Sequence, residues 1–251
     1  MVYEVASKRF GLPVGVCLIG AVLLRAQAPG PLNARDLLIH SDETPLAAAG
    51  FTLKGVEVTR LIAAGYGQSI ETTFSVDSAP GGRLRLERKT GNAIILQIAD
   101  GSTLWTYRPE IKDYFRLPMQ HELRVEWVDQ LRSGRDPANF KEPRILREER
   151  MEFGGEPVEC AVVRAAYAFL PGNPAAREVV RTVWIARRDG LVLRDTWEFA
   201  LPGSGSVGVE KSHIATDYTS IEWGTPLPGD RFTFHPPSDS SPAGGRQTER
   251  K

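Results

Sequence analysis

Several residue clusters in this 251-residue sequence have types that could do chemistry, but their spacing does not fit it. Residues 203–208 spell G-x-G-x-x-G, which binds phosphates where a strand leads into a helix. Strands are predicted on both sides of this segment, so it indicates a hairpin loop. His121 and Glu122 begin like a zinc-protease helix, but Val125 stands where the second histidine is required. The sequence therefore predicts no metal site and no cofactor.

Glu148, Glu149 and Glu152 are the best candidates for paired carboxylates that act as acid and base. Solvated positions at a strand edge explain them equally well and require no cleft. The sequence has no G-x-S-x-G nucleophile elbow and no P-loop. We therefore expect no catalytic residues and no enzymatic activity.

Composition and charge exclude further classes of protein. The chain has 31 Lys and Arg against 31 Asp and Glu, and 41% of its residues are apolar. This composition is typical of a folded protein, and zero net charge favours neither nucleic acid nor an anionic membrane as a partner. Only Cys17 and Cys160 are present, which excludes a disulfide framework. Cys160 lies in an apolar strand pattern and is expected to be a buried structural thiol.

Residues 1–28 have the three parts of a secretory signal. Lys8 and Arg9 form the basic end, residues 12–24 form an apolar stretch, and residues 26–28 read Ala-Gln-Ala. Val16 precedes Cys17 where a lipoprotein signal requires a small residue. We therefore expect a protein exported to the periplasm without a lipid anchor. An uncleaved N-terminal anchor is the alternative.

The chain after the signal shows the two-residue alternation of half-buried strands. It begins at Phe51 and is interrupted by tight turns at Gly81-Gly82, Asp100-Gly101 and Asp189-Gly190. Asn33 can cap a short helix, and residues 119–132 have apolar side chains at helical spacing. The sequence thus predicts a mainly β fold, an α+β fold with few helices. Its curved antiparallel sheet forms an incomplete β-barrel, with one to three helices covering the concave face.

The domain organisation follows from the same pattern. Residues 29–237 are predicted to form a single domain, because the strand texture resumes after the polar connection at 135–143. Residues 238–251 are rich in Ser, Gly, Pro and charge, and are predicted to form a disordered tail.

Aromatic residues gather in two stretches, one around Trp105 and Tyr107 and one around Trp184 and Trp197. They fit a hydrophobic core or the wall of a ligand cavity. In an open curved sheet these two interpretations overlap, so both remain open.

Three hairpin motifs resemble those of the periplasmic lipoprotein carrier (LolA-like and LolB-like) superfamily. They are DGSTLWTYRP at residues 100–109, WIARRDGLVLR at 184–194 and PLPGDRFTFHPP at 226–237. The resemblance implies an incomplete barrel plugged by helices, with acyl chains bound in its hollow. It also implies an arginine that latches a lid helix, for which Arg60 is the candidate.

These observations predict an exported envelope protein that binds or carries a lipidated or other hydrophobic ligand in the hollow of an open β-barrel. Its expected partners are an acyl chain of a lipoprotein or lipid and an envelope membrane protein; the chain itself is expected to be a monomer. The alternative is a sensor or protein-interaction module of the same fold with a filled interior. The predicted lining residues alternate along four strands: Phe74, Leu84, Leu86, Trp105, Tyr107, Leu193, Trp197 and Phe199.

Overall fold

The computed structural model describes residues 33–43, 50–63, 66–119, 139–170, 173, 175–201, 210–224 and 226–243. The predicted signal, the glycine-rich loop at 203–208 and all but the first residue of the predicted helix at 119–132 lie outside these ranges. Within them, no helix is long and apolar enough to cross a membrane.

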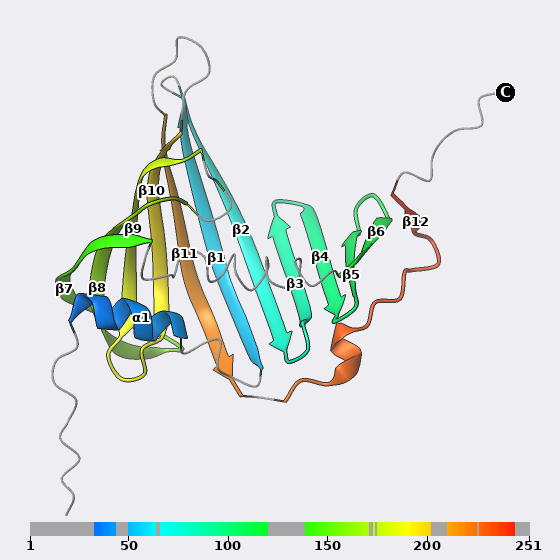
Figure 1. Cartoon of the computed structure of the whole chain (residues 1–251). Coiled ribbons are helices and arrows are strands. Elements are labelled where there is room, and N and C mark those ends of the chain that lie inside the picture. The colour runs from blue at the N-terminus through cyan, green and yellow to red at the C-terminus, as the bar shows by residue number, and fades with distance from the viewer. Residues whose placement is uncertain are drawn as a thin grey trace, which may run out of the picture. The chain divides into compact units, whose positions relative to one another are not determined.

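The described chain contains an α-helix, α1 (Ala34–Glu43), a short 3-10 helix, η2 (Gly229–Phe232), and twelve strands (Figure 1). Asn33 begins α1 as predicted, because its side-chain oxygen accepts a hydrogen bond of 2.9 Å from the backbone N–H of Asp36. The strands are β1 (Phe51–Ala63), β2 (Tyr66–Ala79), β3 (Arg83–Thr90), β4 (Ala93–Asp100), β5 (Thr103–Arg108), β6 (Asp113–Pro118), β7 (Phe140–Phe153), β8 (Glu156–Tyr167), β9 (Arg177–Ala186), β10 (Val192–Leu201), β11 (Glu210–Trp223) and β12 (Ser241–Pro242).

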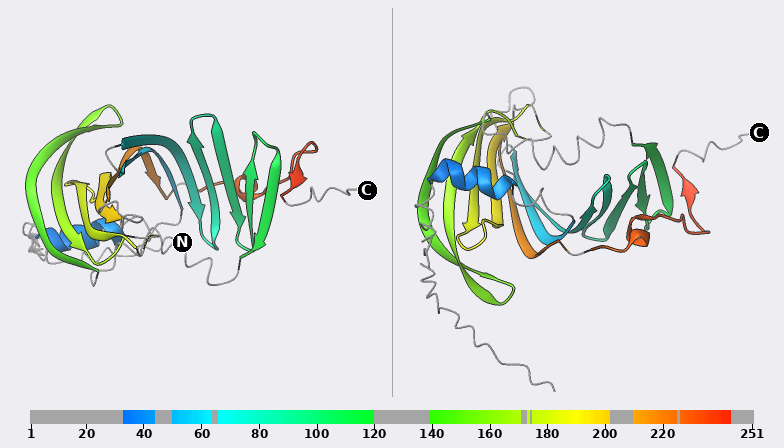
Figure 2. Two further views of the ribbon diagram at one scale, coloured as in Figure 1. Left: turned by 90° about the horizontal axis from the view of Figure 1, so that it is seen from above. Right: turned by 60° about the horizontal axis from the view of Figure 1, so that its bottom comes forward.

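All twelve strands belong to one open sheet, in the order β12-β6-β5-β4-β3-β2-β1-β11-β10-β9-β8-β7. Neighbouring strands are antiparallel except β12, which runs parallel to β6. Two meanders, β1–β6 and β7–β11, are joined where β1 pairs with β11. The strands from β7 to β10 curve, and α1 lies across their concave side (Figure 2). The predicted mainly β fold with a curved, unclosed sheet is confirmed.

The tight turn between β4 and β5 requires a glycine at Gly101. Gly101 has φ of +99°, and a Cβ there would lie 2.5 Å from the carbonyl oxygen of Gly81 in the neighbouring turn. Any larger residue would force the β2–β3 and β4–β5 turns apart. The predicted Asp100-Gly101 hairpin is therefore confirmed. The close approach of the β2–β3 turn explains why a glycine is needed at residue 101.

A β-bulge interrupts the pairing of β1 with β11 between Lys54 and Gly55. Gly55 lies under the edge-to-face pair of Phe74 and Tyr218, whose ring centroids are 6.1 Å apart. A Cβ at Gly55 would lie 2.6 Å from the Phe74 ring, so no other residue fits without displacing it.

Side chains on both faces of the β7–β10 region are buried. Leu37 and Leu38 of α1 pack in one cluster with Val163, Val183 and Phe199. A second cluster on the opposite face contains Val158, Cys160, Val162, Trp184 and Leu193. Cys160 is 0% exposed, as the sequence predicts for a structural thiol. Burial raises the pKa of this thiol to about 11, with nearby carboxylates adding to the effect, so it stays protonated and unreactive.

A C-terminal strap, residues 226–243, packs on β3–β6. Phe232 is 1% exposed, and the guanidinium of Arg83 lies over its ring. Ser241 and Pro242 pair with Asp113 and Tyr114 at the edge of the sheet. The sequence analysis predicts that residues 238–243 belong to the polar tail. In the structure these residues continue the strap alongside β6.

Candidate functional site

The candidate site is the inner face of the sheet, which we define as the face on which α1 packs. Residues paired across antiparallel strands point to the same face, and alternate residues along a strand share it. The register therefore extends this face from Val163 and Val183 beneath α1 to Asp195, Thr216 and onward as far as β6.

The register places five of the eight predicted lining residues on the inner face: Phe74, Leu84, Leu86, Trp197 and Phe199. Leu193 occupies a bulge in β10 and packs in the second cluster. Contact between these residues and a ligand stays a prediction.

Trp105 and Tyr107 lie on the outer face, opposite to Leu84 and Leu86. Their rings are each 5.5 Å from the ring of Phe234 in the strap, and Tyr114 joins the same aromatic cluster. They hold the C-terminal strap to the sheet. Both side chains are half-buried, and their contact with a ligand stays a prediction.

Arg60, the candidate lid latch, is exposed on β1 and is paired with His213. The alternation along β1 places it on the outer face, away from α1. Among the described residues, Arg181 is an arginine that lies buried on the inner face, where it is 2% exposed.

Arg181 forms a buried ion pair with Asp195. Its Nε and Nη2 donate hydrogen bonds to the Asp195 carboxylate at 2.8–3.1 Å, and its Nη1 donates to the Tyr167 hydroxyl at 3.3 Å. The guanidinium also lies 5.2 Å from the centre of the Trp197 ring. The pair thus links β9 to β10 and holds Tyr167 and Trp197 beside each other, with ring centroids 5.0 Å apart.

A row of polar side chains crosses the inner face from this ion pair. Successive cross-strand partners in β10, β11, β1, β2 and β3 form what we call the polar rung: Asp195, Thr216, Glu57, Thr72 and Thr90. The hydroxyls of Thr72 and Thr90 are 2.7 Å apart, and Nη2 of Arg88 donates to Oε1 of Glu57 at 3.0 Å.

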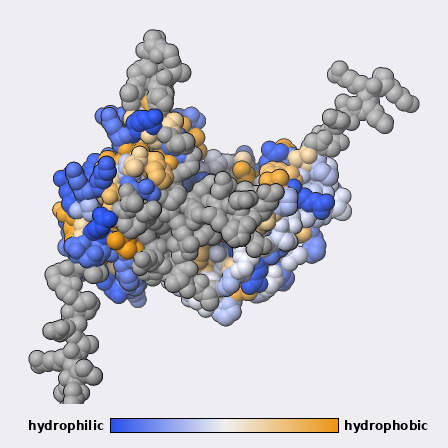
Figure 3. Space-filling view, viewed as in Figure 1, coloured by the Kyte–Doolittle hydropathy of each residue, from blue (hydrophilic) through white to orange (hydrophobic). Residues whose placement is uncertain are grey.

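The inner face becomes mainly apolar beyond the rung, toward β6. Two further rows of cross-strand partners contain what we call the apolar zone: Leu53, Val76, Leu86 and Phe115 in one row, and Phe51, Leu84, Ala99, Leu104 and Leu117 in the other. Gln97 and Thr106 interrupt the first row, and Ser78 interrupts the second. Leu86, Ala99 and Leu104 are buried, while Phe115 and Leu117 are 40% and 44% exposed. Apolar surface also appears in patches between hydrophilic stretches on the side seen in Figure 3.

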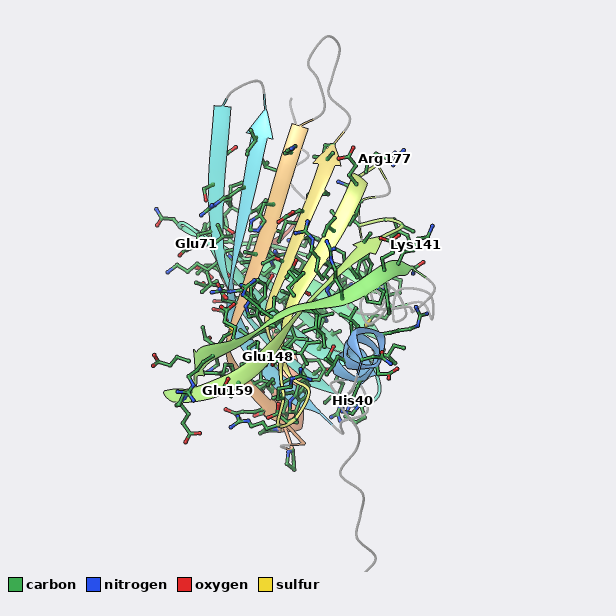
Figure 4. The ribbon with its side chains drawn as sticks, turned by 90° about the vertical axis from the view of Figure 1, so that its left-hand side faces the viewer. His40, Glu71, Lys141, Glu148, Glu159 and Arg177 are labelled. Carbon is green, nitrogen blue, oxygen red and sulfur yellow. The ribbon has the colours of Figure 1, made fainter. Side chains whose placement is uncertain are left out.

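The three glutamates considered for acid–base chemistry do not converge. Glu148 is paired with Ala161 and Glu149 with Cys160, so the two point to opposite faces of β7. A hydrogen bond from Arg187 lowers the pKa of Glu148, which lies exposed on the edge strand β7 (Figure 4). Within the described ranges, no three His, Cys, Asp or Glu side chains are grouped to hold a metal ion.

Sequence reasoning missed the Arg181–Asp195 pair and the anchor of the strap. Asp77 is buried on the outer face, where it accepts hydrogen bonds from Thr52 at 2.8 Å and from Arg231 at 2.5 Å. A charged residue inside the apolar run at 179–185 is the one available signal for Arg181. Its partner could not be assigned, because a bulge shifts the alternation along β10 between Val192 and Arg194.

No protein-family model matches this sequence, and no curated protein matches it. Several solved structures are similar to this chain. LprF from Mycobacterium bovis has 14% identity and a TM-score of 0.45, covering 78% of this chain and 94% of that chain. A LolA superfamily protein from Nitrosomonas europaea has 13% identity and a TM-score of 0.33, covering 81% and 99%.

The complex of MucA and MucB from Pseudomonas aeruginosa also matches, with 14% identity, a TM-score of 0.39 and coverage of 80% of this chain and 61% of that chain. A LolA superfamily protein is thus among the solved structures that this chain is similar to, and membership of that family stays a prediction from the three hairpin motifs.

Proposed function

We propose that this protein binds a hydrophobic ligand on the inner face of its sheet and acts as an exported carrier or binding protein of the cell envelope. The periplasmic location belongs to the proposal and rests on the signal-like residues 1–28. Binding on the face of a sheet requires no cofactor, because burial of apolar surface supplies about 25 cal/mol for each Å² removed from water.

The apolar zone of the inner face carries this proposal. On β3–β6, the row of cross-strand partners Leu84, Ala99, Leu104 and Leu117 is apolar, and the row beside it has Leu86 and Phe115 at its ends with Gln97 and Thr106 between them. α1 packs over β7–β10, and among the described residues no helix packs on the inner face of β3–β6. Phe115 and Leu117 leave this zone accessible at the edge of the sheet. Such a surface fits an acyl chain, which needs contact area rather than hydrogen bonds.

The alternative, a module that recognises a protein partner, has the free edge of β7 as its natural contact. This edge exposes Ile145 and Leu146. However, β7 has two irregularities in its pairing with β8, and Glu142 has φ of +50°. Bulges and alternating charges are typical of edges that resist the addition of another strand. A partner on this side would have to be recognised through side chains.

The test first strips the protein of bound lipid and then adds a fatty acid that carries a dansyl group. The fluorescence of the dansyl group reports its binding and gives the affinity. The variant combines Phe115→Glu with Leu117→Glu, which places two charges on the apolar zone at positions exposed enough to tolerate them. We expect a loss of affinity of about tenfold or more, because each CH₂ group that leaves its apolar contact forfeits about 0.8 kcal/mol.

Ile111→Glu is the matched control, because Ile111 is 57% exposed in the turn between β5 and β6 and lies outside the inner face. It should bind the probe as the parent does. Equal affinity of the parent and the double variant would remove the apolar zone as the binding site. A parent protein that takes up no probe would favour the protein-interaction alternative.

A further inference from the structure

We infer that the ligand of the inner face is an amphiphile whose polar part carries no net charge, and that this part lies on the polar rung. The inference rests on the proposed function and adds the class of ligand. It arises from the arrangement of one polar row and two mainly apolar rows on a single face of the sheet, separated by the row that holds Phe74 and Arg88.

The rung and the apolar zone are consecutive along the same strands. On β2 the inner-face residues run Thr72, Phe74 and Val76, from the rung into the apolar zone. At about 3.4 Å for each residue, Thr72 and Val76 are separated by about 14 Å. One extended molecule can therefore touch the rung with its polar part and the apolar zone with its chain.

The charges of the rung are already matched within the protein. Asp195 is bound by Arg181, and Glu57 is bound by Arg88. A carboxylate placed here would lie beside Glu57, while a cation would lie beside Arg88. Either charge would lose water without gaining an unmatched partner, which is unfavourable in a partly buried site. An uncharged polar group avoids this penalty.

The rung also offers hydrogen-bonding atoms that suit hydroxyl, ester or amide groups. The half-buried hydroxyl of Thr216 makes no hydrogen bond within the described part of the chain, and Glu57 uses only Oε1 toward Arg88. Thr72 and Thr90 share a hydrogen bond and keep further acceptor capacity. A neutral group with donors and acceptors can satisfy these atoms.

The experiment measures, by titration calorimetry, the binding affinities of three ligands with the same ten-carbon tail: decanoate, 1-monodecanoylglycerol and decyltrimethylammonium. All are used below their critical micelle concentrations on delipidated protein. We expect the glycerol ester to bind at least tenfold more tightly than either charged ligand. Preference for a charged ligand, or equal affinity for all three, would overturn the inference and leave the proposed function standing. Failure of all three to bind would contradict the proposed function itself.

Glu57→Gln provides a second, independent readout. It releases Arg88 from its ion pair, so decanoate should bind about tenfold more tightly to this variant than to the parent. Glu71→Gln removes the same charge from the outer face of β2, where Glu71 is exposed and projects away from the sheet (Figure 4). This control should leave decanoate affinity unchanged. The same response in both variants would show that net charge, rather than the rung, governs binding.

Discussion

A buried arginine needs a partner that matches both its charge and its geometry. Arg181 has this in Asp195, which accepts hydrogen bonds from two of its nitrogens, while Trp197 and Tyr167 lie against the guanidinium. The two charges lose most of their hydration, so each depends on the other for compensation. At the scale of single residues, this pair fixes the positions of Tyr167 and Trp197 on the inner face, next to the polar rung.

Substitution of one partner of the pair should therefore reduce the stability of the protein far more than substitution of both. We predict that Asp195→Asn destabilises the protein by about 3–5 kcal/mol, because Arg181 is left buried without a counter-charge. The double variant Arg181→Met with Asp195→Leu should recover most of that loss. Urea denaturation measures both. An Asp195→Asn variant within about 1 kcal/mol of the parent would mean that water or other groups compensate Arg181.

At the scale of elements, the C-terminal strap with its short helix η2 covers the outer face of β3–β6. Its apolar anchors are Phe232 and Phe234, and its polar anchor is the contact of Arg231 with Asp77. Lys112 and Asp239 form a further ion pair at 2.6 Å, but both side chains are more than half exposed. Exposed pairs contribute little, so the strap is held mainly by its phenylalanines.

Phe232→Ala should thus cost about 3–5 kcal/mol and speed amide hydrogen exchange in β3 and β4, the strands that η2 contacts. Lys112→Ala should change stability by less than about 1 kcal/mol and leave that exchange as in the parent. Exchange that rises equally in both variants would show that the polar contacts, rather than the aromatic ones, hold the strap.

At the scale of the whole molecule, local patterns in the sequence predict much of the fold. The period-two runs and the Gly81-Gly82, Asp100-Gly101 and Asp189-Gly190 turns are strands and turns in the structure. Short-range rules suffice there, because a tight turn and strand alternation involve only neighbouring residues.

The site depends on information that these patterns lack. Alternation places Trp105 with Tyr107 and Leu84 with Leu86, but only the register across β3, β4 and β5 reveals that the two sets face opposite sides. The bulges at Gly55 and in β10 shift the alternation further. The polar rung draws one residue from each of five strands, so no single segment of sequence could show it.

The most direct test of the account is native mass spectrometry, with solvent extraction, of protein exported to a periplasm and purified without detergent. The account predicts one co-purifying amphiphile for each protein chain, with an acyl tail and an uncharged polar part, and its loss from the variant that combines Phe115→Glu with Leu117→Glu. A bare protein mass under gentle conditions, together with no uptake of added 1-monodecanoylglycerol, would contradict ligand binding on the inner face.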